Sequence, residues 1–559
     1  MKLKTISLHY YFKLFILLLA VTSCGISKSI HDIPDVSAYD ATIAKKTTIN
    51  DSTFTSGNNS LAKNKYGSYE LFVEGNAYQI GLNTGLLTQD LFATQEDAFL
   101  SKVDELVPSK FKQYLLRKIL AFYNRKMYLH VPEAYKAEIY GLSKYASNKY
   151  NHIAKEYLRV MYLHGAHDIG HAMQDLMLVG CSSFAAWGNK TEDGQLLIGR
   201  NLDFYAGDDF AKNKIVAFVN PTDGYKFMSV TWPGMIGVVS GMNEHGLTVT
   251  INAGKSKIPW IAKTPISILN REILQYATNI EEAIAIAKKR EVFVSESIFV
   301  GSAKDKKAVT IEVSPKNFGV YKVENTNQLI CTNHFQSDAY AEDKNNLKAI
   351  TESHSQYRYE RLEELLATTE KLNVQDAVDI LRNKEGLHDK AIGYGNEKAL
   401  NQLLAHHGIV FKPEERQVWV SSNPYQLGAF VAYDLDEVFS ETATSHVQLS
   451  KPELTIEADP FQYTQAYKNY EAYRIASKEL QHAISANTYI PSKELQETIQ
   501  LNPNYWEVYY LVGKYYYQKG FYTAALNAFE TAKTKEITTV PDQEELDKYI
   551  KKIKRKLDL

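Results

Sequence analysis

The stretch MLVGCSSFAAWGNKTEDGQLLIGRNLDF (residues 177–204) decides how the chain is interpreted. It places Cys181 directly after a glycine, deep inside the chain, and a strand-like run, QLLIGRNLDF, follows. The small residues Gly180, Ser182 and Ser183 around the thiol favour close approach of another backbone over core packing. Downstream, short β-rich runs are separated by Gly, Asn, Asp and Pro and interrupted by pairs of helical stretches. This alternation predicts a layered α+β domain whose sheets are covered by helices.

Composition and charge limit the class of protein. A chain of 559 residues with 45% hydrophobic and 23% charged residues is typical of folded protein, and its length predicts two or three folded parts. The formal net charge is −2. Binding to nucleic acid relies on concentrated Lys and Arg that neutralise phosphates, so we expect no nucleic-acid partner.

The N-terminus has the features of an export signal. Lys2 and Lys4 precede an apolar run over residues 14–21, and small residues follow before Cys24. The apolar run is shorter than the roughly 20 residues of a membrane span. Because VTSC resembles a bacterial lipobox, we expect a signal peptide over residues 1–23, lipidation of Cys24 and tethering to the cell envelope, on the periplasmic face or the cell surface. An ordinary signal peptide that ends near a cysteine is the alternative.

The rest of the chain divides by composition. Residues 24–65 are rich in Ser, Thr, Asn, Asp and Lys and predict a flexible tether, whereas residues 66–180 show helical periodicity. The β-rich part covers residues 181–450. Residues 459–559 are helical again, and YWEVYYLVGKYYYQKGFYTAALNAFETAK (505–533) has the packing positions of a tetratricopeptide repeat, a module that would bind a protein partner. A plain helical hairpin is the alternative.

Cys181 is the cysteine that needs explanation. The chain has three cysteines, Cys24, Cys181 and Cys331, and no disulfide pair is obvious; Cys331 lies in the apolar run QLICTNHF, which indicates a buried thiol. A thiol nucleophile needs a base, and no histidine stands in a familiar motif, although a partner brought close by folding stays open. Cleavage of the Gly180–Cys181 bond would supply one, because a terminal α-amine has a pKa of about 7.7–8.0. The helical region upstream would then be a propeptide.

Four motifs in order carry a family resemblance. GCSSFAAWG with DGQLLIGRNLDF (180–204), GMNEHGLTVTINAG (241–254), ICTNHF (330–335) and SQYRYERL (355–362) resemble the cysteine N-terminal nucleophile (Ntn) hydrolases. The resemblance covers about residues 130–440 and is strongest to the penicillin acyltransferase-like family of autoproteolytic acyltransferases and hydrolases, with choloylglycine hydrolases, penicillin V acylases and acid ceramidase as relatives. It implies a four-layer αββα sandwich.

The resemblance implies roles for residues of the first motif. Cys181 would supply both the nucleophilic sulfur and the base amine. Arg200 and Asp203 would hold the amine and favour the thiolate, since a nearby arginine lowers the pKa of a thiol. A surface ion pair is the alternative for Arg200 and Asp203.

The later motifs add the remaining implied site residues. Asn252, through its backbone N–H, and Asn333, through its side-chain amide, would form an oxyanion hole; the alternative is that both are turn residues at strand ends. Arg358 would brace the site. Arg361 competes with it, because the two lie three residues apart on one helical face, but we favour Arg358. A solvated helix charge is the alternative for Arg358.

The resemblance also implies the reaction. We expect a hydrolase or acyltransferase that opens linear N-acyl amides through an acyl thioester, without metal or organic cofactor, and whose two fragments stay associated after processing. Water and an amine both remain open as acceptors, and fatty acyl, aryl-acetyl, bile-acid and peptide-like acyl groups all remain open as substrates. An interaction protein built on a catalytically idle scaffold is the second hypothesis.

A histidine cluster offers a rival site. HGAHDIGHAMQD places His164, His167 and His171 on one helical face, and the last two have metal-ligand spacing. Asp168 stands where a zinc-protease helix has Glu, and no third ligand is evident, so we prefer histidines packed near the scission site. The pair at 406–407 is expected to be structural.

Overall fold

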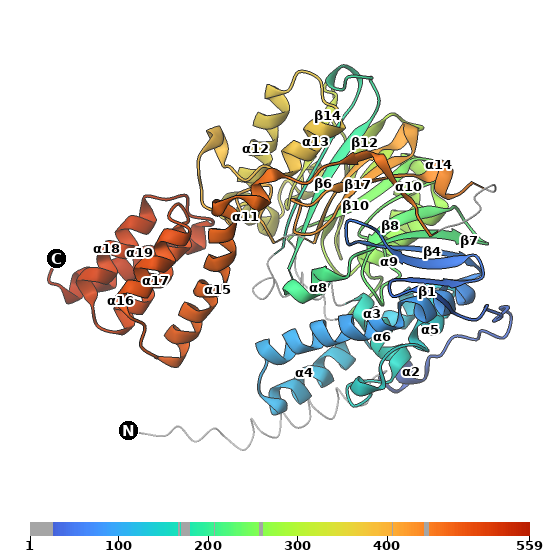
Figure 1. Cartoon of the computed structure of the whole chain (residues 1–559), viewed down its shortest axis with the longest axis horizontal. Helices are drawn as coiled ribbons and strands as arrows, with labels where there is room; N and C mark the ends of the chain where they lie inside the picture. The colour runs from blue at the N-terminus through green and yellow to red at the C-terminus, as the bar shows by residue number, and fades with distance from the viewer. Residues whose placement is uncertain are drawn as a thin grey trace.

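Two β-sheets run through the centre of the molecule (Figure 1). The computed structural model describes residues 26–165, 168, 179–205, 207–255, 261–404, 406–440 and 447–559. The larger sheet has eleven strands, in the order β1 (Thr47–Asn50), β2 (Thr53–Ser56), β3 (Asn59–Lys63), β4 (Tyr69–Gly75), β7 (Ile215–Pro221), β8 (Phe227–Thr231), β9 (Ser240–Asn243), β10 (Leu247–Ala253), β11 (Glu296–Ser302), β12 (Lys307–Val313) and β13 (Phe318–Tyr321).

The smaller sheet has seven strands. Their order is β14 (Gln328–Cys331), β5 (Val179–Ala186), β6 (Leu197–Phe204), β15 (His407–Lys412), β16 (Gln417–Ser421), β17 (Phe430–Asp434) and β18 (Ser450–Ile456). Every pairing in this sheet is antiparallel. All eight residues of β6 are buried, as expected of a strand covered on both faces.

The two sheets share an apolar core. Phe218 and Met228 of the larger sheet belong to one buried cluster with Ile198, Phe411 and Val420 of the smaller sheet. The strand alternation explains this, because every second side chain of a strand points to the same face. The expected mixture of strands and helices is confirmed.

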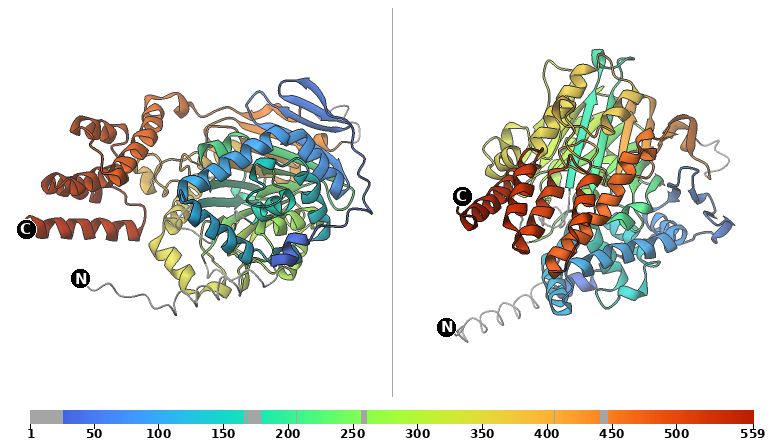
Figure 2. Two further views of the ribbon diagram at one scale, coloured as in Figure 1. Left: turned by 90° about the horizontal axis from the view of Figure 1, so that it is seen from below. Right: turned by 60° about the vertical axis from the view of Figure 1, so that its left-hand side comes forward.

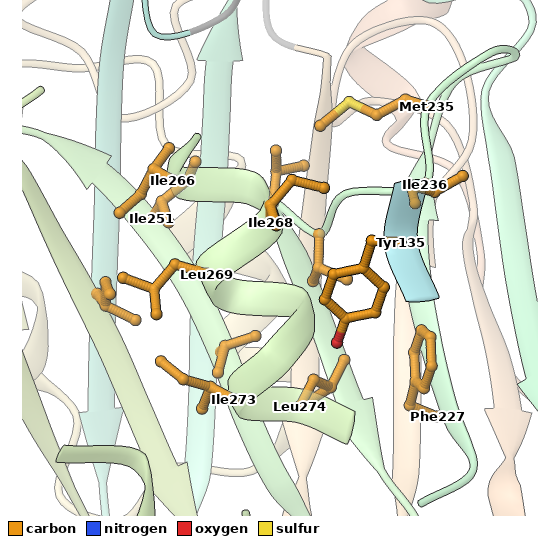
Figure 3. Close-up of a cluster of buried hydrophobic side chains, with 14 of the residues drawn as sticks. Tyr135, Phe227, Met235, Ile236, Ile251, Ile266, Ile268, Leu269, Ile273 and Leu274 are labelled. Carbon is orange, nitrogen blue, oxygen red and sulfur yellow. The ribbon is translucent and has the colours of Figure 1, made fainter. Parts of the chain in front are cut away.

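Helices pack against the other faces of the sheets. The main ones are α3 (Ala77–Leu106), α5 (Glu133–Ser143), α6 (Glu156–His164), α9 (Ile266–Tyr276) and α10 (Ile280–Lys289) near the larger sheet, and α12 (Ser355–Thr368) and α13 (Val374–Leu381) near the smaller one. Figure 3 shows side chains of α9, among them Leu269 and Leu274, between Ile251 of β10 and Tyr135 of α5. The remaining helices before residue 440 are α2 (Ile26–His31), α4 (Lys110–Tyr123), α8 (Asp208–Lys212), α11 (Lys344–Glu352) and α14 (Leu435–Val438).

The N-terminal region differs from the expected tether and helical propeptide. Strands β1, β2 and β3 lie within residues 24–65, and β4 pairs in parallel with β7, which lies beyond Cys181 in the chain. Their Ser, Thr and Asn content suggested disorder, but Leu61 and Leu71 bury apolar area in the core cluster of the larger sheet. Strands β1 to β4, which all precede residue 181, are therefore part of the larger sheet.

The C-terminal part is helical, and Figure 2 shows it beside the sheets. Its helices are α15 (Gln465–Ala486), α16 (Ser492–Leu501), α17 (Trp506–Gln518), α18 (Tyr522–Lys533) and α19 (Val540–Lys556). Gly513 of α17 lies so close to Phe529 of α18 that a Cβ there would stand 2.7 Å from the ring. These are two of the positions expected to pack in the repeat.

The predicted signal peptide and Cys24 lie outside the described residues. Among the helices that the structure describes, none has the length and apolar content needed to cross a bilayer.

Candidate active site

Cys181 lies in the middle of the smaller sheet. Its strand, β5, pairs with β6 on one side, where Cys181 faces Leu202, and with β14 on the other. Ser183, two residues on, donates its hydroxyl to Asn252 of the larger sheet at 2.9 Å. Because side chains two apart share a face, the buried Cys181 thiol also points toward the larger sheet.

Three predicted residues hold the backbone and sulfur of Cys181. The Cys181 N–H donates to Asn333 Oδ1 at 2.9 Å, and Arg358 Nη1 donates to the Cys181 carbonyl at 2.5 Å. Arg200 Nη2 lies 3.9 Å from Cys181 Sγ. Stretches that are far apart in the sequence thus converge on one residue.

Arg358, rather than Arg361, reaches the site. From α12 its guanidinium also donates to Ser182 Oγ at 2.8 Å and to Asn333 Oδ1 at 2.6 Å. Arg361, three residues later, is engaged by the carboxylates of Glu364 and Asp389. The two arginines are both buried, but only Arg358 has contacts with residue 181 among those described.

Arg200 is fixed by the larger sheet. It donates to the Ile251 carbonyl at 2.5 Å and to Ser240 Oγ at 2.6 Å. The Ser240 hydroxyl lies 2.9 Å from His407 Nε2, and His407 Nδ1 lies 2.8 Å from His406 Nδ1. Burial lowers the pKa of both histidines well below the usual value, so both are neutral. The histidine pair therefore supports Arg200 through Ser240.

The partners assign the tautomers of this relay. Since Arg200 donates to Ser240, the Ser240 proton is left for His407 Nε2. His407 then carries its own proton on Nδ1 and donates it to His406 Nδ1, which places the proton of His406 on Nε2. Within the described ranges that buried Nε2 has no hydrogen-bond partner.

Asp203 lies on the opposite face of β6 from Arg200, because the two are three residues apart in a strand. In the part of the chain that the structure describes, its Oδ1 accepts from Gln426 at 3.5 Å and its Oδ2 has no hydrogen-bond partner. Burial raises the pKa of Asp203 to about 8, although Arg358 and Arg200 oppose the rise. Asp203 thus offers a buried carboxyl with spare acceptor capacity beside Gly180, its register partner.

The thiol itself is not activated in the unbroken chain. Burial raises the pKa of Cys181, and the positive charge of Arg200 only partly offsets this, while the carboxyl groups of Asp203 and Glu296 add to the rise. The expected effect of arginine on the thiol is present but is smaller than the cost of burying a thiolate. A separate base is required for nucleophilic attack.

Asn252 does not occupy its predicted role. Its side chain accepts from Ser183 and donates to the Cys331 carbonyl at 2.9 Å. The Gly254 N–H donates to Ser295 at 2.8 Å, so Asn252, two residues earlier and opposite Ser297, also directs its N–H toward β11. Asn252 therefore ties the two sheets together.

Ala253 has the orientation that was predicted for Asn252. Successive residues of a strand direct their backbone groups to opposite sides, and the carbonyls of Ile251 and Ala253 accept from Arg200 and from Asn333 Nδ2, respectively. The Ala253 N–H points to the same side as its carbonyl, toward the site. Asn333 itself is held by Ser355 Oγ, which lies 2.8 Å from the Asn333 N–H.

Gly180 is needed for close approach. A Cβ at this position would stand 2.4 Å from Gln402 Nε2, and Gln402 is itself buried. The bond that precedes Cys181 is therefore covered by a side chain from the segment before β15.

A small apolar cavity lies beyond the N-terminal end of β5. Its volume is about 40 Å³, and it lies between α3, α6, the end of β6 and the loop before β9. The aromatic residues that line it are Phe92, Phe99, Phe204, Phe210 and Trp232. Phe204 is the register partner of Val179, two residues before Cys181.

The histidine cluster is only partly described. His167 and His171 lie outside the described residues. His164 Nδ1 donates to the Val160 carbonyl at 2.8 Å, and its Nε2 accepts from the Ile236 N–H at 3.0 Å, while burial lowers its pKa to about 4. Asp168 accepts from the Ile266 N–H at 2.8 Å. Within the described ranges no group of three or more His, Cys, Asp or Glu has the arrangement of a metal site.

Sequence reasoning missed several residues of the site, namely Ser240, Ala253, Gln402, His407 and Gln426. Of these, only Ala253 stands in one of the four motifs, directly after the residue that was predicted, Asn252. The histidine pair gave the only signal, because two adjacent histidines before a strand are unusual enough to be noted.

Part of the chain matches the model of a protein family. The sequence model of the family described as acyl-coenzyme A:6-aminopenicillanic acid acyl-transferase matches residues 189–424. The chain is similar to that family over this part, which is less than half of its length and begins after Cys181.

Two curated proteins are related in sequence. An uncharacterized protein of Archaeoglobus fulgidus is 25% identical over 276 residues, which are 45% of this chain and 45% of that protein. Protein dcd1B of Dictyostelium discoideum is 24% identical over 268 residues, 44% of this chain and 50% of that protein. The chain thus spans about half the length of the curated relatives it matches.

Solved structures are also similar, among them the following two. The Caenorhabditis elegans orthologue of N-acylethanolamine-hydrolyzing acid amidase has 19% identity and a TM-score of 0.31, covering 42% of this chain and 93% of that one. A mutant of conjugated bile acid hydrolase from Clostridium perfringens has 13% identity and a TM-score of 0.31, covering 46% of this chain and 92% of that one.

Proposed function

We propose that the chain is a self-processing Ntn-type amide hydrolase or acyltransferase, with a four-layer αββα sandwich and Cys181 as nucleophile. The observation that carries the proposal is that the sulfur, N–H and carbonyl of Cys181 contact Arg200, Asn333 and Arg358. The match of residues 189–424 to an acyl-transferase family supports acyl chemistry at this site.

Processing would begin at the Gly180 carbonyl. Cys181 Sγ attacks the Gly180 carbonyl carbon, the C–N bond breaks, and the thiol proton passes to the departing nitrogen. Water then hydrolyses the thioester, which leaves a carboxylate on Gly180 and a free amine and thiol on Cys181. The spare oxygen of Asp203, beside Gly180, would accept from the new ammonium group.

In the processed enzyme the Cys181 amine would serve as base. It takes the thiol proton, the sulfur attacks the substrate amide carbon, and the ammonium protonates the leaving amine. Water or a second amine then releases the acyl group from the thioester. The Ala253 N–H and the Asn333 side-chain amide would donate to the oxyanion.

The small cavity beyond the N-terminal end of β5 supports a proposal about the polarity of the substrate's acyl group. Its aromatic lining favours an apolar acyl group over a charged one, because a buried charge without partners is strongly unfavourable. This narrows the range of N-acyl amides worth testing first.

The proposal is tested by intact mass and N-terminal sequencing of the purified protein. A fragment that begins Cys-Ser-Ser-Phe is expected, and Cys181→Ala should abolish it, whereas Cys331→Ala, at the other described cysteine, should not. Acyl groups should be released from a panel of N-acyl amides by the wild type and by Cys331→Ala, but not by Cys181→Ala. Hydrolysis by a chain that is unbroken through residue 181 would contradict the amine base.

The attachment and partner predictions remain proposals. Lipidation of Cys24 is tested by labelling cells with a radioactive fatty acid and comparing Cys24→Ser. If the wild type releases no acyl group from any amide in the panel, binding of a protein partner by the tetratricopeptide-like region would be the main function.

A further inference from the structure

Helix α4 (Lys110–Tyr123) has an exposed position. Figure 1 shows it beside α3 in the lower part of the view, away from both sheets. The structure describes α4 over its whole length and buries none of its side chains. It follows α3 after a short connection, residues 107–109, in which Ser109 caps its N-terminus.

An apolar stripe runs along this helix. Phe111 is 75% exposed, Leu115 37% and Ile119 53%. These residues are spaced by four, so they lie one above another on one face. Tyr114, 50% exposed, lies beside the stripe. Side chains of this size are usually buried, and a continuous exposed row of them marks an interaction surface.

The charges beside the stripe have one sign. The cations of residues 110–126 are Lys110, Lys112, Arg117, Lys118, Arg125 and Lys126, and this segment has no Asp or Glu. Lys110 and Lys112 flank Phe111 on either side of the helix. Acidic side chains lie at the end of α3: Asp104, 3.8 Å from Lys110, and Glu105, which pairs with Lys102.

We propose that this α4 surface binds an anionic lipid surface. The apolar stripe would enter the boundary between headgroups and acyl chains, and the lysines would extend their ammonium groups to the lipid phosphates. Charge decides against a second copy of the chain as occupant, because pairing two α4 surfaces would bring their cations together. The inference does not depend on the proposed hydrolase activity or on lipidation of Cys24.

Vesicle sedimentation tests the proposal. The full chain with Cys24→Ser, which cannot carry the proposed lipid anchor, is mixed with vesicles of equal parts phosphatidylglycerol and phosphatidylethanolamine, or of phosphatidylcholine alone. Binding is expected to the anionic vesicles, and it should weaken as salt increases because surface charges are screened. Absence of binding to the anionic vesicles at low salt would overturn the proposal.

Variants locate the surface. Phe111→Glu with Ile119→Glu should lower the partition coefficient at least about tenfold, since each change removes a large exposed apolar side chain that would otherwise be buried in the bilayer. The matched control is Ile475→Glu with Tyr489→Glu, which changes exposed apolar residues of the C-terminal part and should leave binding unchanged. Equal loss in both pairs would overturn the assignment to α4.

Two further measurements separate the alternatives. Lys112→Gln with Lys118→Gln should weaken binding to anionic vesicles several-fold and leave any residual binding to phosphatidylcholine unchanged. Light scattering should give the mass of one chain both for the parent and for the Phe111→Glu, Ile119→Glu variant. A parent dimer that dissociates in that variant would assign the surface to a second copy and overturn the lipid proposal.

Discussion

Replacing Arg358 by lysine tests whether the geometry of the guanidinium, beyond its charge, holds the reacting residue. Arg358 donates to the Cys181 carbonyl at 2.5 Å, to Ser182 Oγ at 2.8 Å and to Asn333 Oδ1 at 2.6 Å. One ammonium group retains the charge but cannot span both ends of this fork.

The size of the effect follows from the bonds lost. A hydrogen bond to a charged group contributes about 1.5–3 kcal/mol, and lysine is expected to forfeit two of the three, so the lower limit of the loss is about 3 kcal/mol. At 1.36 kcal/mol per factor of ten, this is a roughly 100-fold slower reaction. The same loss should slow self-cleavage, because Arg358 contacts residue 181 in the unbroken chain.

The assay follows the Cys-Ser-Ser-Phe fragment by mass spectrometry and acyl release from an N-acyl amide. Arg361→Lys is the matched control: it lies on the same helix, is equally buried and binds Glu364 and Asp389 instead. Arg361→Lys is expected to lower the free energy of unfolding about as much as Arg358→Lys does. The folded Arg361→Lys protein should still cleave itself and release acyl groups at the wild-type rate. The reasoning is refuted if folded Arg358→Lys cleaves itself at the wild-type rate, or if both variants are slowed equally.

Three further predictions concern buried polar groups. Ser240→Ala removes the acceptor of Arg200 Nη1 and should slow acyl release about tenfold, at a cost of roughly 1–2 kcal/mol, with little change in the KM for an N-acyl amide. The pKa of Asp203 is raised to about 8, so between about pH 4 and 8 the folded, uncleaved protein binds more protons than the unfolded chain. Its free energy of unfolding, measured by urea titration, should therefore fall as the pH rises over this range. Asp203→Asn should make this dependence on pH less steep. Glu96→Gln breaks the buried ion pair with Arg159 (2.7 Å) and should destabilise the protein by about 3–5 kcal/mol, whereas Glu105→Gln, at an exposed pair, should change urea stability by less than about 1 kcal/mol.

The sequence motifs were informative where local chemistry was distinctive. Cys181, Arg200, Asn333 and Arg358 were each predicted from a short stretch, and the structure brings them into contact. The family resemblance favoured Arg358 over Arg361. Helical spacing alone could not separate them, because both lie on one helical face and only the docking of α12 distinguishes them.

Other features depend on contacts that a linear pattern does not contain. The N–H direction of Asn252 depends on its register with β11, and a shift of one residue exchanges it with Ala253. Strands β1–β3 were assigned to a tether because of their polar composition, and β4 was assigned to the helical region. The partner strand of β4, β7, begins about 140 residues after β4 ends, so the local sequence does not reveal the pairing. The relay from Ser240 to His406 likewise joins strands that are remote in sequence.

The parallel pairing of β4 with β7 bears on whether the two fragments would separate after cleavage before Cys181. Seven register pairs join the two pieces along this seam, and Tyr135 from the first piece packs with α9 of the second. The two fragments would therefore run as two bands on a denaturing gel but elute as one species from a size-exclusion column under native conditions. The shorter fragment could dissociate only if the eleven-stranded sheet were disrupted. An anchor attached to the N-terminal fragment would therefore also retain the fragment that carries Cys181, until a denaturant separates the two.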